Sequence, residues 1–128
     1  MENKKIVLAI DDNEMQLEIF EKMLSKKFDI RPAKSASDAI YYLNRNPADI
    51  ILLDIEMPNI NGFEFLYDIR KIPRFRKVPI IIVSGKTGQD FFNEARNSSA
   101  FEVLSKPVKL EKLVETIEKA LAPKPKHS

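Results

Sequence analysis

Apolar residues gather in five short runs along the chain: Ile6–Ile10, Phe28–Arg31, Ile50–Leu53, Ile80–Val83 and the weaker Phe101–Leu104. Three of the runs are continuously apolar and rich in Ile, Leu and Val. Continuous apolarity of this kind is typical of strands that are buried on both faces, as they are in parallel sheets. The runs therefore predict the strands of a parallel sheet.

The segments between the runs carry apolar residues three or four positions apart, which is the spacing of one helix face. Two segments begin with a capping pattern, Ser35 with Asp38 and Asn61 with Glu64. Five helices are expected, with faces formed by Met15, Ile19, Phe20, Met23 and Leu24; by Ala36, Ala39, Ile40 and Leu43; by Leu66 and Ile69; within residues 89–97; and by Leu110, Leu113, Val114, Ile117 and Leu121.

Strand and helix alternate along the chain, which predicts an α/β fold of the doubly wound class. The alternation fills residues 1–122, and the prolines that follow favour a basic tail or the start of a linker over residues 123–128. Ligands of such folds bind at the carboxyl ends of the strands. The side chains that end the predicted strands are therefore the first candidates for chemistry.

Composition removes several classes of function. The 128 residues suffice for one domain, and the absence of cysteine excludes disulfides and thiolate chemistry. The net charge of +2 is too small to indicate nucleic acid by itself, and no apolar run has the length of a membrane span. The amino terminus lacks a signal-peptide pattern, so we expect a cytoplasmic protein that binds neither nucleic acid nor membrane directly.

Acidic residues end two of the predicted strands. Asp11 and Asp12 follow the first strand, where adjacent carboxylates favour a hard cation such as Mg²⁺. Asp12 or Asn13 is equally suited to cap the next helix, and this alternative stays open. Asp54 follows the third strand, and the next helix already has a cap in Asn61. Asp54 is therefore a candidate nucleophile or metal ligand, with a solvated strand-end acid as the plain alternative.

A hydroxyl and a lysine lie at the ends of the last two strands. Ser84 can donate to a phosphoryl oxygen or bond to the local backbone. Lys106 can neutralise a phosphoryl group, although most lone lysines are simply solvated. Pro107 restricts Lys106 to an extended conformation, which indicates a positioned side chain.

The order and spacing of these residues resemble the receiver domain of bacterial response regulators over about residues 5–121. The resemblance rests on Asp11-Asp12-Asn13, on Asp54 within Leu53-Asp54-Ile55-Glu56-Met57-Pro58, on Gly62, on Ser84 and on Lys106-Pro107. The Asp-x-x-Met-Pro run, with a glycine eight residues after the acid, is highly specific. The resemblance implies a flavodoxin-like receiver fold with strand order 2-1-3-4-5 and five helices.

The same resemblance implies a signalling domain rather than an enzyme. Asp54 would accept a phosphoryl group from the histidine of a kinase or phosphotransfer protein. Mg²⁺ would be held by Asp11, Asp12, Asp54 and the backbone carbonyl of Glu56, while Lys106 would offset charge on the transferring group. The signal would pass to a downstream protein target or to a fused output domain.

Further roles in switching and signal lifetime follow from the resemblance. Ser84 would bind a phosphoryl oxygen and draw its loop inward, and the Lys106–Pro107 bond would be cis. Glu56 and Lys86 would line the path of the hydrolytic water. Their opposite charges favour a salt bridge that shields the acyl phosphate, with two independent solvated side chains as the alternative.

The sequence departs from the family pattern at two places. Ser99-Ala100 stands where many members have Gly-Ala, and Val103 stands where the switch aromatic normally lies. Val103 has no ring to rotate, so we expect the switch to use movement of the loop at residues 84–88. Gly85 and Gly88 would give that loop its backbone freedom.

Three other functions fit parts of the pattern. A phosphatase of the haloacid-dehalogenase type also uses a strand-end Asp, but it needs a second Asp where this chain has Glu56. A flavodoxin needs a phosphate-binding loop after the first strand, where Asp11 and Asp12 would repel phosphate. A degenerate receiver that acts only as an interaction surface would not need the full set of acids, hydroxyl and lysine.

Overall fold

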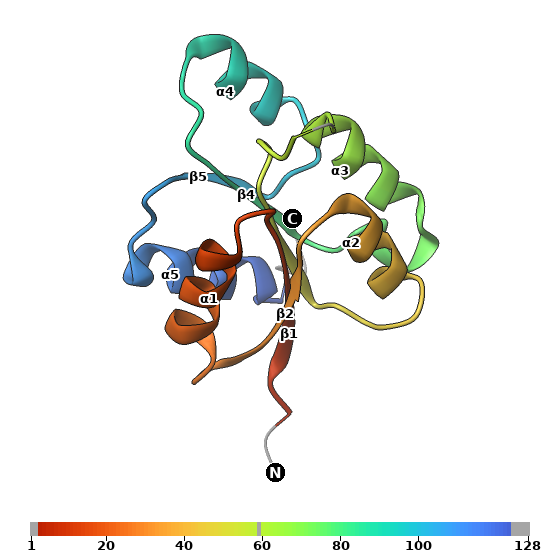
Figure 1. Ribbon diagram of the computed structural model, residues 1–128, viewed down its shortest axis with the longest axis vertical. Coiled ribbons are helices and arrows are strands. Elements are labelled where there is room, and N and C mark those ends of the chain that lie inside the picture. The colour runs from red at the N-terminus through yellow and green to blue at the C-terminus, as the bar shows by residue number, and fades with distance from the viewer. Residues whose placement is uncertain (1–2, 59, 124–128) are drawn as a thin grey trace.

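The computed structural model describes residues 3–58 and 60–123, which form a five-stranded parallel sheet flanked by helices (Figure 1). The strands lie in the order β2-β1-β3-β4-β5, which confirms the expected topology. Their bounds are β1 (Lys5–Ile10), β2 (Phe28–Ala33), β3 (Ile50–Leu53), β4 (Ile80–Ser84) and β5 (Glu102–Ser105).

Five α-helices and one 3₁₀ turn connect the strands. They are α1 (Glu14–Leu24), α2 (Ala36–Leu43), α3 (Gly62–Lys71), the turn η1 (Pro73–Phe75), α4 (Gln89–Arg96) and α5 (Leu110–Leu121). Each helix within the described ranges is too short or too polar to cross a membrane. The expected tail at residues 123–128 lies outside the described residues except for Pro123.

Helices cover both faces of the sheet and bury two apolar clusters. One cluster joins the sheet to α2, α3 and α4, and the other joins it to α1 and α5. Figure 1 shows α1 and α5 on one side of the sheet and α2 and α3 on the other. Alternate residues of β1 enter opposite clusters, Leu8 and Ile10 the first and Val7 and Ala9 the second. Burial on both faces explains the continuously apolar strand sequences.

Polar side chains define where three helices begin. Asn13 caps α1 by accepting hydrogen bonds from the amides of Met15 and Gln16. Ser35 and Asn61 cap α2 and α3 in the same way, as their sequence patterns predict. The cap of α1 is thus Asn13, which leaves the carboxylate of Asp12 free for another role.

The predicted apolar face of α1 is partly wrong. Met15 and Ile19 are 70% and 44% exposed, whereas Leu17, which the prediction omitted, is only 5% exposed. The buried stripe is Leu17, Phe20 and Leu24, and at 100° per residue Met15 and Ile19 lie on the opposite side of the helix. Leu110 of α5 is likewise exposed, because it lies in the first turn, beyond the main contact with the sheet.

Some element limits also differ from the predicted ones. β2 continues through Pro32 to Ala33, which is possible because β2 is an edge strand and has a free side. β5 begins one residue later than predicted, β1 begins at Lys5, and α4 ends at Arg96. β4 includes Ser84, so this hydroxyl belongs to the sheet itself.

Candidate functional site

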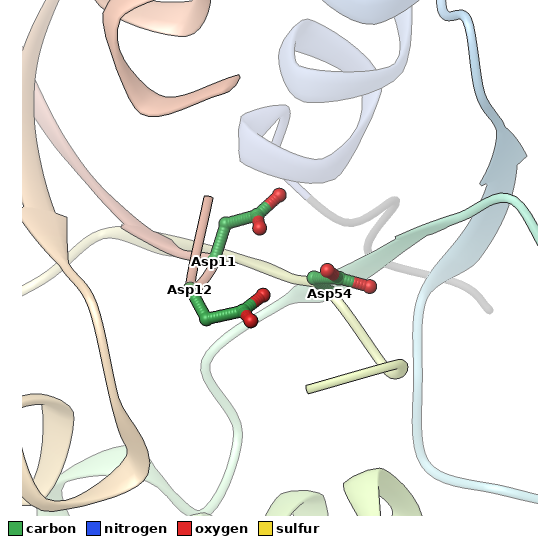
Figure 2. A group of neighbouring side chains, drawn as sticks. All are labelled: Asp11, Asp12 and Asp54. Atoms are coloured by element: carbon green, nitrogen blue, oxygen red, sulfur yellow. The ribbon is translucent and has the colours of Figure 1, made fainter. Parts of the chain in front are cut away.

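Three aspartates meet at the carboxyl ends of two neighbouring strands. Asp11 and Asp12 directly follow β1, and Asp54 directly follows β3, with Ile10 paired to Leu53 between the two strands. One carboxylate oxygen from each aspartate lies within 4.8 Å of the other two, and Figure 2 shows the three side chains together. The parallel register therefore gathers residues that are more than forty positions apart in the sequence.

The turns after β1 and β3 orient two of these carboxylates. Asp11 Oδ1 accepts the amide of Asn13 at 2.9 Å, and Asp54 Oδ1 accepts the amide of Glu56 at 2.9 Å. Asp11 is 1% exposed and Asp54 6%, whereas Asp12 is exposed. Both buried side chains are thus held in place by backbone two residues further on.

Gly62 holds the segment after Asp54 against α3. A Cβ atom at Gly62 would lie 2.5 Å from Ile55 Cγ1 and 2.7 Å from the carbonyl oxygen of Ile55. Only glycine permits this approach of the helix to the loop. The glycine of the family motif therefore supports the backbone next to Asp54.

Lys106 is the cation of the site. Its Nζ donates to Asp11 Oδ2 at 3.0 Å and to Asp54 Oδ2 at 3.4 Å. Lys106 follows β5, and its peptide bond to Pro107 is cis, as the resemblance implied. Lys106 thus links the loops that follow β1 and β3 to the loop after β5.

The pKa values of Lys106 and Asp54 reflect this arrangement. Burial lowers the pKa of Lys106, but its hydrogen bond to Asp11 and the charges of Asp11 and Asp54 outweigh burial, so the pKa is raised overall. Burial raises the pKa of Asp54 and the charge of Asp11 adds to the rise, whereas the amide of Glu56 and Lys106 oppose it. Ionisation of Asp54 is therefore unfavourable in this arrangement, and the charge of a bound cation would offset that cost.

Ser84 ends β4, the strand between β3 and β5, and is 1% exposed. Its hydroxyl donates to Glu56 Oε1 at 2.9 Å and accepts the amide of Lys86 at 3.0 Å. The amide of Gly85 donates to the same Glu56 oxygen at 2.8 Å. Sequence reasoning missed this backbone donor, because an amide carries no residue signature.

The expected salt bridge between Glu56 and Lys86 is absent from the described structure. Across residues 3–58 and 60–123, the side chain of Lys86 takes part in no ion pair. The physical reason is that the Glu56 carboxylate already accepts hydrogen bonds from Ser84 and Gly85. A pairing of Glu56 with Lys86 in the phosphorylated protein stays a prediction.

The two departures from the family pattern, Ser99-Ala100 and Val103, lie just before β5 and on it. Val103 is half-buried on β5, where it lines a surface cavity of about 340 Å³ together with Phe92 and Phe101. The Ser99 hydroxyl accepts Arg70 Nε at 2.9 Å. Gly88 has a φ of 115° at the start of α4, a conformation that favours glycine.

The acid cluster suits a hard divalent cation. With three carboxylates and Lys106 all ionised, the cluster carries a net charge of −2, which one divalent ion balances. Oxygens that share one Mg²⁺ lie about 3–4 Å apart, given bonds of about 2.1 Å, so a small inward movement of the aspartates forms such a site. Carboxylate oxygens are also the ligands that Mg²⁺ prefers.

Comparison with known proteins agrees with the geometry. The profile described as "Response regulator receiver domain" matches residues 7–118. The chain is 29% identical over 117 residues to Protein PilH of Pseudomonas aeruginosa, covering 91% of this chain and 97% of PilH. The solved structure of chemotaxis protein CheY4 of Vibrio cholerae superposes with a TM-score of 0.86 at 25% identity, covering 93% of this chain and all of CheY4.

Larger proteins contain similar segments. The chain is 38% identical over 106 residues to Protein-glutamate methylesterase/protein-glutamine glutaminase 3 of Rhodopseudomonas palustris, covering 79% of this chain and 28% of that protein. It spans only about a quarter of the length of the first two curated relatives that it matches. The family profile covers most of the chain, and the acids, hydroxyl and lysine occupy one end of the sheet. The chain therefore belongs to the response regulator receiver domain family, the phosphoacceptor domains of two-component signalling.

Proposed function

We propose that this receiver domain accepts its phosphoryl group on Asp54, in a reaction that requires Mg²⁺. The observation that carries the proposal is Lys106, whose Nζ contacts both Asp11 and Asp54. Asp54 is the member of the acid cluster that also has Glu56 and Ser84 close by. A phosphoryl group on Asp54 would thus meet a lysine on one side and a hydroxyl on the other.

In the proposed reaction, a carboxylate oxygen of Asp54 attacks the phosphorus of a phosphohistidine on a histidine kinase or phosphotransfer protein. A P–O bond forms, the P–N bond breaks, and the imidazole of the partner leaves. Asp11, Asp12, Asp54 and the carbonyl of Glu56 would hold Mg²⁺, which offsets charge on the transferring group. Lys106 adds a fixed positive charge, and the amide of Glu56 keeps the Asp54 carboxylate oriented.

The proposed switch begins at Ser84 and does not need an aromatic rotor. When the Ser84 hydroxyl turns to a phosphoryl oxygen, the loop from Ser84 to Gly88 follows it, and α4 begins directly after that loop. Val103 stays in place beside the cavity at α4 and β5. The altered α4 surface then meets a downstream protein target or a fused output domain.

Phosphorylation by acetyl phosphate with Mg²⁺ tests the assignment. Intact-mass measurement should show one added phosphoryl group on the wild-type protein, and both Asp54→Asn and excess chelator should abolish it. Asp68→Asn is the matched control, because Asp68 is an exposed acid on α3 that loses the same charge. Equal labelling of the Asp54→Asn variant, or labelling in chelator, would contradict the proposal.

A further inference from the structure

The carboxylate of Glu56 accepts hydrogen bonds from two donors at the carboxyl end of β4. Its Oε1 accepts the Ser84 hydroxyl at 2.9 Å and the Gly85 amide at 2.8 Å. A serine hydroxyl has one hydrogen, and the lone pairs of Ser84 Oγ already accept the amide of Lys86. While Glu56 is bound, Ser84 therefore has no hydrogen left to donate to any other oxygen.

A glutamate carboxylate and a phosphoryl group bind the same kind of hydrogen-bond donor. Both present negatively charged oxygens, and both form their strongest hydrogen bonds with N–H and O–H donors. Glu56 is two residues after Asp54, so its backbone belongs to the site while its side chain reaches across to β4. The carboxylate thus occupies the hydroxyl of Ser84 and the amide of Gly85, the donors that a phosphoryl oxygen on Asp54 would need.

We propose that the Glu56 carboxylate is an internal ligand that competes with the phosphoryl group for the Ser84 hydroxyl and the Gly85 amide. The inference rests on the proposed phosphorylation of Asp54. Phosphorylation displaces the carboxylate into solvent, and loss of the phosphoryl group lets it return. Glu56 thereby sets how readily the domain enters its active state, without touching the bonds that are made and broken.

The surroundings of Glu56 permit this exchange. The Glu56 residue is exposed, so its carboxylate has solvent to move into, whereas Ser84 is buried as the last residue of β4, where its hydroxyl has to exchange one acceptor for another. A Cβ atom on Gly85 would lie 3.4 Å from Glu56 Oε1, so the carboxylate rests directly against the glycine. Once displaced, the Glu56 carboxylate is free to pair with Lys86, a pairing that the described structure does not contain.

The expected size of the effect follows from the population of the open arrangement. Because the exposed Glu56 side chain also loses rotamer freedom when it is held, we expect its two hydrogen bonds together to contribute no more than about one net hydrogen bond, which leaves the donors free in about a tenth to a fifth of molecules. An anion that needs the free donors then binds about fivefold to tenfold more weakly than its intrinsic affinity. Removing the Glu56 carboxylate should therefore strengthen binding of such an anion by the same factor.

Beryllofluoride with Mg²⁺ is the probe, because it mimics a phosphoryl group on an aspartate without turnover. Its dissociation constant should fall about fivefold to tenfold in Glu56→Ala. Glu56→Asp keeps the charge but is one methylene too short to reach Ser84, so it should bind nearly as tightly as Glu56→Ala. Glu14→Gln is the charge control: it removes one negative charge from the start of α1, and Glu14 pairs with Lys34 away from Ser84.

A structural readout separates direct contact from general repulsion. In the ¹H–¹⁵N spectrum without ligand, the amide proton of Gly85 should lie downfield in the wild type and move upfield in Glu56→Ala and Glu56→Asp. Glu14→Gln should leave the signal in place. The inference fails if Glu56→Asp binds like the wild type, or if Glu14→Gln tightens binding as much as Glu56→Ala.

The same titration distinguishes this inference from the proposed function. If neither wild type nor any variant binds beryllofluoride in the presence of Mg²⁺, the assignment of Asp54 as the phosphoacceptor is wrong. If all four proteins bind it equally, Asp54 keeps its role and only the competition by Glu56 is refuted.

Discussion

Charged side chains near the two ends of β4 and β5 have different kinds of partner. Near the ends where these strands begin, the guanidinium of Arg70 is surrounded by neutral oxygens: it donates to the Ser99 hydroxyl, to the Ser99 carbonyl at 2.8 Å, to the Phe75 carbonyl at 3.1 Å and to the Val78 carbonyl. Near the ends where the strands finish, three carboxylates lie together, and two of them, Asp11 and Asp54, contact Lys106.

This difference in partners distinguishes Arg70, which stabilises the fold, from the aspartates, which are the candidates for binding. Burial lowers the pKa of Arg70, but the guanidinium keeps its proton and has four acceptors around it. At the other end, burial raises the pKa of Asp54, and the nearby charge of Asp11 adds to the cost of ionisation. The charge of Arg70 is thus matched by acceptors of the protein itself, whereas the acid cluster has an excess of negative charge that the proposed Mg²⁺ would balance.

The largest expected effect concerns Arg70. Arg70→Ala should lower the free energy of unfolding by about 3 kcal/mol, because it removes the guanidinium that donates to the carbonyls of Phe75 and Val78 and to Ser99. Arg74→Ala is the matched control, since Arg74 is exposed and its guanidinium carbon lies 5.8 Å from the centre of the Phe75 ring; it should cost about 0.5 kcal/mol. Urea denaturation measures both, and equal losses would mean that Arg70 does not organise this end.

The second effect concerns metal at the acid cluster. The proposed Mg²⁺ site exists only where the aspartates are assembled, so Mg²⁺ at ten times its Kd should stabilise the protein by about 1.4 kcal/mol. Asp12→Ala should lose most of this response while the metal-free protein becomes no less stable, because one like charge is gone. Thermal melts with Mg²⁺ and with chelator give the comparison. If Mg²⁺ leaves the wild-type melting curve unmoved, the aspartates are not a metal site.

The smallest effect concerns pH without metal. The pKa of Asp54 is raised in the folded state, so its contribution to stability is full below the unfolded value of 3.8 and is lost as pH rises through the folded value. Asp54→Asn should therefore be the more stable protein near neutral pH, by on the order of 1 kcal/mol, and the two should converge near pH 4. Chelator-treated samples unfolded in urea across this range test it. A wild type that is more stable at neutral pH would show that Lys106 outweighs burial and repulsion.

The edge of the sheet that carries the candidate side chains was predictable from periodicity, whereas the strand order that makes those side chains neighbours came from the family resemblance. Parallel strands that read as apolar runs must finish at one edge, so Asp11, Asp54, Ser84 and Lys106 had to gather there. Helix caps were equally readable, since they depend on residues only three positions apart.

Side-chain direction was not predictable in the same way. The sequence pairs Glu56 with Lys86 by charge, but a buried hydroxyl and a backbone amide hold the carboxylate instead. Arg70 gave no signal either, because its partner Ser99 lies 29 positions away and its other acceptors are main-chain carbonyls. Met15 and Ile19 were misplaced because apolar character alone does not reveal which of two sides of a helix meets the sheet.

The long sequence separation within the site has a consequence for the order of events in a cell. Lys106 lies 95 positions from Asp11 and 52 from Asp54, and it follows the strand at the edge of the sheet. A growing chain presents its acids well before its lysine, and contacts between distant residues form late in folding. A nascent or half-folded molecule would therefore hold clustered acids without their cation and repel a phosphodonor. Under the proposed function, docking of the last strand is the step that brings Lys106 to the acids and makes the domain ready for a phosphoryl group.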